Sequence, residues 1–294
     1  MGIDDKYSAL WVSYSTLNDF LTCPRAYYLK NIYRYPPTGN KIALMTPSLA
    51  LGQAVHDVIH KLSTIQSDKR FQSSPVLMLN EQWQKIAGKK GGFYNEKHEA
   101  LYKKRGEDMM RRLLNNPGPL LNLTLRLKKD LLSFWLSQEE GIILCGKVDW
   151  LEYLPKSDSV HIIDFKTSRG VEEKNSLQLP IYFLLASAVQ KRKVESVSYW
   201  YLDRNNSPTQ MDIPDKDHAK ETILLLAKDV KLARALNRFV CKQSGCQACL
   251  PYEKITSGRA EHIGMNEYKR DVFIIPPDTN EDALLSSETD EQLL

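Results

Sequence analysis

Two segments of the chain carry carboxylates that could hold a metal ion. Asp164 lies fifteen residues after Asp149, directly behind the apolar run Val160–Ile163, and Lys166 follows it. Side chains alternate along a strand, so Asp164 and Lys166 should project from one face and Phe165 from the other. If the segment with Asp149 is the neighbouring strand of a hairpin, its carboxylate reaches the same place. Two carboxylates suit Mg²⁺ or Mn²⁺ far better than zinc.

Such an ion would polarise a scissile phosphate and supply hydroxide from bound water. Lys166 could then orient that water or stabilise the charge of the transition state. The alternative is a surface ion pair in a β-hairpin, because an Asp-x-Lys triplet occurs by chance in many proteins. The triplet alone therefore does not decide between catalysis and structure.

Three further side chains could complete the site. His56, on a predicted helix, offers a neutral imidazole as another metal ligand, although a helix-surface or core histidine is its ordinary interpretation. Gln178 and Tyr182 are four residues apart and share one face of a predicted helix. Pro180 fits only in the first turn of that helix, so Gln178 should lie close to the end of the preceding strand.

The ordered set of these motifs resembles the RecB-like branch of the PD-(D/E)XK nuclease superfamily. The opening segment is similar to that of the AddB nuclease domain and of CRISPR-associated RecB-like exonucleases. The resemblance covers roughly residues 13–255 and rests on the following motifs: Ser13-x-Ser15-x-Leu17, Cys23-Pro24-Arg25-x-Tyr27-Tyr28, Gly52-x-x-x-His56, Gly146-Lys147-Val148-Asp149, Asp164-Phe165-Lys166-Thr167 and Gln178-x-x-x-Tyr182.

The resemblance implies a role for each of the candidate residues. Asp164 stands where many relatives have Glu, and it has the same ligating group on a side chain one methylene shorter. The implied roles are catalysis for Asp149, Asp164 and Lys166, metal binding for His56, Asp149 and Asp164, and the positioning of catalytic groups and DNA for Gln178 and Tyr182.

The resemblance also implies an iron–sulfur site. Relatives with a four-iron, four-sulfur cluster use one cysteine of the Cys-Pro segment, here Cys23, and three near the C-terminus. Cys246 and Cys249 match two of those three, but Ile255 stands where the last cysteine should be. Cys241 could replace it, since loop ligands can arrive from either side.

Two other interpretations of the cysteines stay open. The same four residues could form a Cys₄ zinc site, or they could be free thiols of a degenerate site. Five cysteines are an odd number for a disulfide framework, and clustered cysteines in a reducing compartment more often bind metal. The fifth, Cys145, is most simply a small buried apolar residue.

The element pattern predicts an α/β fold with a sheet flanked by helices. The resemblance implies a restriction-endonuclease-like core: a mixed central sheet flanked by helices, a helical N-terminal insertion and a possible C-terminal metal-cluster staple. A single nuclease domain should span 11–255, with a helical subregion at about 46–118, a catalytic core at about 121–213 and the cysteine-containing end at 239–255. Apolar periodicity, caps and breakers predict helices at 13–33, 46–62, 79–86, 96–114, 172–191 and 215–239, and strands at 124–127, 132–136, 142–154, 160–165, 194–202 and 211–213.

Composition excludes several classes of protein. The 294 residues are 42% hydrophobic and 26% charged, which is average for a globular chain and unlike a disordered or small disulfide-rich one. No apolar run approaches the roughly 20 residues of a membrane span, and the first residues lack a signal-peptide pattern, so we expect a cytoplasmic protein without membrane contact.

The net charge of +4 is an average over two dissimilar parts. Residues 1–270 carry +11, which is compatible with a polyanionic partner. The segment 271–294 has no basic residue, and we expect it to be an acidic flexible tail. Its seven acidic residues are Asp271, Asp278, Glu281, Asp282, Glu288, Asp290 and Glu291.

These observations predict a metal-dependent DNA nuclease of PD-(D/E)XK type. We expect an exonuclease that hydrolyses single-stranded DNA or DNA ends in repair, recombination or CRISPR adaptation. The alternative is a catalytically silent DNA-binding or interaction subunit of a helicase–nuclease complex. The chain has no Gly-x-x-x-x-Gly-Lys-Ser/Thr motif, so any unwinding must come from a helicase or CRISPR-adaptation partner.

Overall fold

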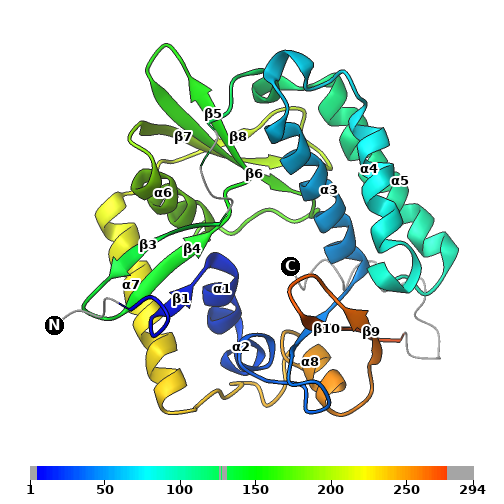
Figure 1. The fold of residues 1–294 in the computed structure, drawn as a ribbon, viewed down its shortest axis with the longest axis vertical. Helices are drawn as coiled ribbons and strands as arrows, with labels where there is room; N and C mark the ends of the chain where they lie inside the picture. Colours follow the sequence, from blue (N-terminus) through cyan, green and yellow to red (C-terminus); the bar gives the residue numbers. More distant parts are fainter. Residues whose placement is uncertain (1–4, 126, 128–130, 277–294) are drawn as a thin grey trace.

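The computed structural model describes residues 5–125, 127 and 131–276 (Figure 1). Three short 3₁₀ turns, Ser67–Lys69, Gly88–Gly91 and Gly118–Leu121, connect the helices of the first half. The helices and strands are β1 (Leu10–Val12), α1 (Tyr14–Thr22), α2 (Pro24–Asn31), β2 (Lys41–Leu44), α3 (Pro47–Thr64), α4 (Pro75–Ile86), α5 (Glu96–Asn115), β3 (Leu132–Ser137), β4 (Ile142–Gly146), β5 (Trp150–Leu154), β6 (Ser159–Lys166), α6 (Gln178–Val189), β7 (Lys193–Tyr201), β8 (Thr209–Met211), α7 (Lys216–Ala235), α8 (Leu250–Thr256), β9 (Glu261–Met265) and β10 (Arg270–Ile274).

A central mixed sheet has the strand order β5-β6-β7-β8. Strands β6 and β7 are parallel, and the two outer pairs are antiparallel. Val160 and Ile162 of β6 pack with α6 and α7 on one face, whereas Ile163 and Phe165 pack with α3, α4 and α5 on the other. Because both faces are covered (Figure 1), most of β6 is buried, and its last residues carry Asp164 and Lys166.

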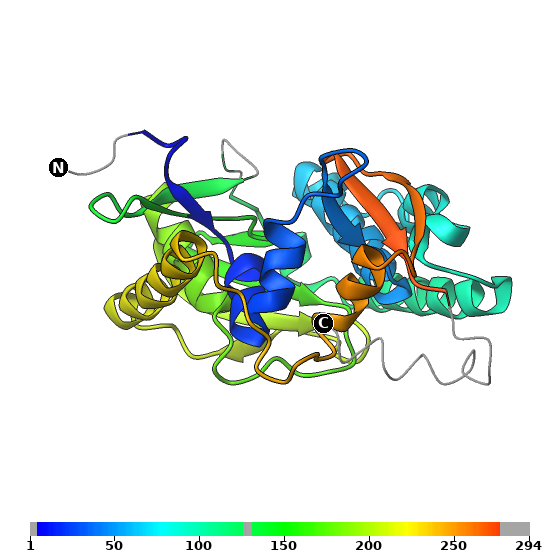
Figure 2. The same cartoon turned by 90° about the horizontal axis from the view of Figure 1, so that it is seen from below.

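Two smaller sheets flank the central one. In the first, β1 and β3 both pair with β4, and α6 packs across β3 and β4 as well as β7. In the second, β10 lies between β2 and β9. This second sheet and α8 lie beside α2 (Figure 2), so the end of the chain packs against its beginning.

The predicted helix over 13–33 is two helices. Ser13 caps α1 in a reciprocal pair of hydrogen bonds with Thr16, as its hydroxyl position suggested. Cys23 is extended, with φ −164°, and its sulfur accepts a hydrogen bond from the Ala26 N–H at the start of α2. Pro24 follows at the first position of α2, where a proline is tolerated. In the interior of one continuous helix it would remove a backbone hydrogen bond, so the chain forms two helices instead. The break places the sulfur of Cys23 at the junction.

Three other predicted elements are shorter than expected. The strand predicted over 142–154 is divided into β4 and β5, which leaves Lys147, Val148 and Asp149 between them. The helix predicted over 172–191 begins only at Gln178. Of the strand predicted over 124–127, Thr124 forms an isolated bridge with Glu152, and residue 126 lies outside the described residues. Strands β1, β2, β9 and β10 were not predicted.

The predicted tail begins too early. Asp271 lies in the middle strand of the second small sheet and is 2% exposed. Thr38 donates a hydrogen bond to one oxygen of Asp271, and His262 lies 2.9 Å from the other, so this carboxylate belongs to the fold. The rest of the predicted tail, 277–294, lies outside the described residues. Among the described helices, none is long and apolar enough to cross a membrane.

Candidate active site

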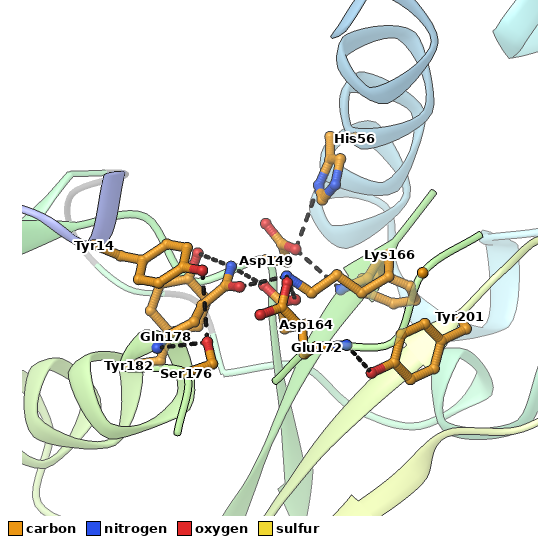
Figure 3. A network of polar contacts seen from close by, with 12 residues as sticks. Tyr14, His56, Asp149, Asp164, Lys166, Glu172, Ser176, Gln178, Tyr182 and Tyr201 are labelled. Carbon is orange, nitrogen blue, oxygen red and sulfur yellow. Dashed lines mark hydrogen bonds and ion pairs between the residues drawn. The ribbon is translucent and has the colours of Figure 1, made fainter. Parts of the chain in front are cut away.

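Strand β6 delivers Asp164 and Lys166 to the same face at its C-terminal end (Figure 3). Asp164 is 1% exposed, and Lys166 Nζ lies 3.1 Å from its Oδ2. Phe165 points to the opposite face, where its ring stacks on Trp200 at 5.6 Å between centroids. The strand alternation predicted for this triplet is confirmed.

Asp149 joins this pair from the neighbouring strand. Residue Trp150 is opposite Ile163 in the antiparallel β5–β6 pair, so Asp149, one position earlier, lies beside the end of β6. The Phe165 N–H donates a hydrogen bond of 3.1 Å to Asp149 Oδ2. The break between β4 and β5 thus frees the Asp149 side chain to face β6, as the hairpin interpretation required.

Helix α3 brings His56 over the same carboxylate. His56 Nδ1 lies 3.3 Å from Asp149 Oδ2. One turn earlier, a Cβ on Gly52 would lie 3.4 Å from Thr167 Oγ1, so α3 passes close to the end of β6. Thr46 caps the helix and Pro47 begins it, which fixes its entry beside the sheet. The Gly-x-x-x-His spacing therefore lets α3 approach the sheet at Gly52 and places the candidate ligand His56 one turn later.

Gln178 connects the charged groups through its amide. Its Nε2–H donates to Asp164 Oδ1 at 2.8 Å and to the Tyr182 hydroxyl oxygen at 3.2 Å, and its Oε1 accepts from Lys166 Nζ. Pro180 is in the first turn of α6, as predicted, which places Gln178 at the start of the helix and beside β6. The structure thus brings together all the catalytic and metal-binding candidates of the sequence.

Four residues of this network were not predicted. Glu172 Oε1 lies 2.8 Å from Lys166 Nζ, and the Glu172 N–H donates to the Tyr201 hydroxyl at 3.1 Å. Ser176 donates a long, 3.5 Å hydrogen bond to the Tyr14 hydroxyl at the start of α1. The sequence assigned Glu172 to a helix. Its loop position was signalled by the Thr167-Ser168-Arg169-Gly170 stretch, which favours irregular backbone directly after the strand.

The pKa values of the two carboxyls diverge. Burial, opposed by Lys166 and reinforced by Asp149, raises the pKa of Asp164 to about 7. Burial also acts to raise the pKa of Asp149, but the imidazolium of His56 outweighs it and holds that pKa below its usual value. Two close carboxylates in one site commonly separate in this way.

The two basic groups remain protonated beside these carboxyls. Burial lowers the pKa of His56, yet the charge of Asp149 outweighs burial and raises it to about 9. The carboxylates of Asp164 and Glu172 likewise hold the pKa of Lys166 above its usual value in spite of burial. Lys166 is therefore a cation and a hydrogen-bond donor, and not a proton acceptor.

The donor set fits a hard divalent ion. Among the described residues, Asp164 Oδ2 is buried and accepts no hydrogen bond of acceptable geometry, although Lys166 Nζ is nearby. A buried oxygen left in this way calls for an explanation, and a cation is one. Asp149 and Asp164 would supply the oxygen ligands of Mg²⁺ or Mn²⁺, and His56 a nitrogen ligand once its proton is displaced.

A cavity of about 200 Å³ opens beside Asp149. Its lining includes His60 and Ser63 of α3 and Lys147, two residues before Asp149. These are donor groups of a kind that contacts phosphate oxygens. The cavity therefore extends the candidate site along the end of α3.

The four candidate cysteines also converge, at a second place. The sulfurs of Cys23, Cys241, Cys246 and Cys249 all lie within 4.8 Å of one another. Backbone N–H groups of Gln243 and Gly245 lower the pKa of the Cys241 thiol to about 7. Cys145 lies outside this group, in β4.

Comparisons with known proteins identify the family. No curated protein matches the chain. The solved structures similar to it include a crystal structure at 2.19 Å of a candidate exonuclease from Eubacterium rectale, with 11% identity, a TM-score of 0.48, and coverage of 82% of this chain and 87% of that chain. The model of the PD-(D/E)XK nuclease superfamily matches residues 11–255, which, with the mixed sheet flanked by helices, confirms the predicted restriction-endonuclease-like core. The chain therefore belongs to the PD-(D/E)XK nuclease superfamily.

Proposed function

We propose that the protein is a metal-dependent deoxyribonuclease of the RecB-like branch, acting as an exonuclease on single strands or DNA ends. Family membership supports the coarser statement that it is a nuclease, and hence a hydrolase. The observation that carries the proposal is the convergence of Asp149, Asp164 and Lys166 with His56 and Gln178, which come from separate segments of the chain.

In this proposal, Asp149, Asp164 and His56 would hold Mg²⁺ or Mn²⁺ beside the cavity. An ion bound there would supply Lewis-acid activation of the scissile phosphate and of a water molecule. Lys166 donates hydrogen bonds to that water or to a phosphate oxygen, because its raised pKa keeps it cationic. Glu172 and Gln178 restrict where its ammonium group can lie.

Gln178 has a positioning role in the proposed mechanism. Its amide binds Asp164 through the donor end and Lys166 through the acceptor end, so the two groups keep a fixed separation. The Tyr182 hydroxyl oxygen accepts a second hydrogen bond from the same amide and so helps to fix its orientation. Groups placed in this way need little rearrangement when the substrate binds, which is a general source of rate.

The proposed binding of nucleic acid rests on the net charge of the chain and on the residues that line the cavity. The +11 of residues 1–270 attracts nucleic-acid backbone. Lys147 and His60 line the cavity and could contact the phosphates that flank the scissile one. The preference for single strands or ends follows from the resemblance to the RecB-like branch. The assignment to repair, recombination or CRISPR adaptation, and a helicase or CRISPR-adaptation partner, follow from the resemblance to the RecB-like branch alone.

End-labelled substrates test the proposal. Single- and double-stranded DNA and matched RNA, labelled at either the 5′ or the 3′ end, are incubated with the protein and Mn²⁺ or Mg²⁺. We expect mononucleotide or short products released from one end of single-stranded DNA. Internal cuts would contradict exonuclease action, equal cleavage of RNA would contradict the DNA preference, and binding without cleavage would favour the silent subunit.

The variant Lys166→Met links that activity to the site. It removes the ammonium group at similar side-chain length, and we expect the cleavage rate to fall at least about 10²-fold. Lys220→Met, an exposed position on α7, is the matched control and should leave the rate unchanged. Equal rates for Lys166→Met and the control would remove Lys166 from the mechanism.

A further inference from the structure

The four clustered cysteines, Cys23, Cys241, Cys246 and Cys249, form a group separate from the carboxylates, which we call the cysteine group. Cys23 and Cys249 are buried, and Cys241 and Cys246 are partly buried. The apolar side chains around them come from α2 and α8. The group thus lies where the start of the chain packs against the segment after α7 (Figure 2).

The separation of the sulfurs does not fit the cluster that the resemblance implies. In a four-iron, four-sulfur cluster each thiolate binds a different iron at a corner of the cube, so the cysteine sulfurs are roughly 6 Å apart. Here all four lie within 4.8 Å of one another, and Cys246 Sγ and Cys249 Sγ are 3.7 Å apart. Around one zinc ion, bonds of about 2.3 Å in a tetrahedron separate the sulfurs by about 3.8 Å.

Ile255 stands where relatives with an iron–sulfur cluster have their last cysteine, and its surroundings explain why the ligand set of this chain differs from theirs. Ile255 is 2% exposed and packs with Ile42 and Phe273, so its place is part of an apolar core and not of a ligand shell. Cys241, which precedes Cys246 and Cys249 in the sequence, supplies the fourth sulfur instead. Ser244 and Gly245 have positive φ values of 54° and 131°, which turn the backbone so that Cys241 and Cys246 meet.

Backbone donors are already directed at the sulfurs. The Cys246 N–H donates to Cys249 Sγ at 3.3 Å, and the Ala26 N–H donates to Cys23 Sγ at 3.5 Å. Burial raises the pKa of the Cys249 and Cys23 thiols, and these N–H groups oppose that effect by stabilising the thiolate, the form of cysteine that binds metal. Two ligands two residues apart, Cys246 and Cys249, are also the spacing common in structural zinc sites.

We infer that the cysteine group binds a single zinc ion in tetrahedral thiolate coordination, in place of a four-iron, four-sulfur cluster. The ion joins the junction between α1 and α2 to the segment that leads into α8. The four ligands leave no open position, so the ion is structural and takes no part in hydrolysis. This inference stands or falls independently of the nuclease proposal.

Metal analysis of the full-length protein tests the inference. The protein is produced with both zinc and iron supplied and with iron–sulfur assembly proteins co-expressed, and it is purified without oxygen, since a cluster protein can take up zinc after oxidation. We expect one zinc per chain, negligible iron and sulfide, and no absorbance band at about 400 nm. Iron and sulfide in amounts comparable to the protein, or a metal-free protein in which the four thiols of the cysteine group react with an alkylating reagent as Cys145 does, would overturn the inference.

Two further measurements locate the ion. X-ray absorption at the zinc edge should show one shell of sulfur at about 2.3 Å. Cys241→Ser should lower zinc retention by more than about tenfold, whereas Cys145→Ser, the matched control outside the group, should keep one zinc. Full zinc retention by Cys241→Ser would overturn the assignment of this ligand, and the absorption spectrum of the unaltered protein decides the coordination even if a variant fails to fold.

Discussion

The carboxylate site (Asp149, Asp164, Lys166, His56 and Gln178) and the cysteine group are both assembled from distant parts of the sequence, but they differ in what holds them together. In the carboxylate site, charges and hydrogen bonds between side chains already fix the arrangement. In the cysteine group, the four thiols meet among backbone donors and apolar side chains, and the described residues place no charged side chain among the sulfurs. The carboxylate site is therefore organised by its own side chains, whereas we expect the bound ion to add most of the cohesion of the cysteine group.

This difference predicts opposite responses to a chelator. Brief exposure to EDTA should abolish cleavage, by more than about 10²-fold, because Mg²⁺ and Mn²⁺ bind weakly and exchange with solvent. Added Mn²⁺ should restore the rate within the mixing time. Zinc in the cysteine group should stay bound, because structural zinc sites have apparent binding free energies of about 10–16 kcal/mol. Cleavage and zinc content are measured on the same samples. Simultaneous loss of both would contradict the proposed difference in how tightly the two sites hold their ions.

A change in the cysteine group should act on stability. Cys23→Ser removes the ligand between α1 and α2, and we expect the free energy of unfolding to fall by at least about 2 kcal/mol. Hydrogen exchange should accelerate in α1 and α2 before the central sheet. Cys145→Ser is the control. If Cys23→Ser unfolds at the temperature of the control, the group does not join the two ends of the chain.

A change at Gln178 should act on rate and leave stability almost unchanged. Gln178→Ala frees Asp164 and Lys166 from their common partner, and we expect cleavage to fall about 10–100-fold, as for other residues that orient metal ligands. Gln190→Ala, at the other end of α6, is the matched control. The apparent affinity for Mn²⁺ should weaken only in the first variant, and an unaltered affinity would assign Gln178 a role in packing alone.

The smallest effect concerns the close approach of α3. Gly52→Ala should change stability by less than about 1 kcal/mol, because the added Cβ meets Thr167 Oγ1 at an ordinary contact distance of 3.4 Å and alanine favours helix. Gly52→Leu should displace α3 and lower the rate, since His56 lies one turn later. Thermal unfolding and cleavage are compared for both, and full activity of the leucine variant would show that His56 does not depend on this contact.

Local patterns made the carboxylate site predictable. Alternation in β6 and the four-residue spacing at the start of α6 placed Asp164, Lys166, Gln178 and Tyr182 correctly relative to one another. His56 was identified as a candidate ligand only through the order of the motifs, because nothing local in its helix distinguishes it from a core histidine. Glu172 was missed because its loop has no periodicity, and only the fold brings it to Lys166.

The ends of the chain were harder to predict because their partners are remote. Strands β2 and β10 are stable through pairing across more than 200 residues, and β10 contains the buried acid Asp271, which sequence reasoning assigned to a solvated tail. Convergence of the cysteines was predicted by count, yet their spacing left iron, zinc and free thiols open. Our inference of zinc rests on the distances between the sulfurs, which composition and periodicity do not contain.

The most direct test of the central claim is cleavage by Asp164→Asn at saturating Mn²⁺. The amide keeps the shape of the side chain, and its oxygen can still accept from Gln178 Nε2, but an NH₂ group replaces the oxygen beside Lys166 and the negative charge that would hold a divalent ion is lost. We predict a loss of at least about 10³-fold in rate with single-stranded DNA, an unchanged unfolding temperature and full zinc content. Undiminished cleavage by a correctly folded Asp164→Asn protein would contradict the assignment of this site.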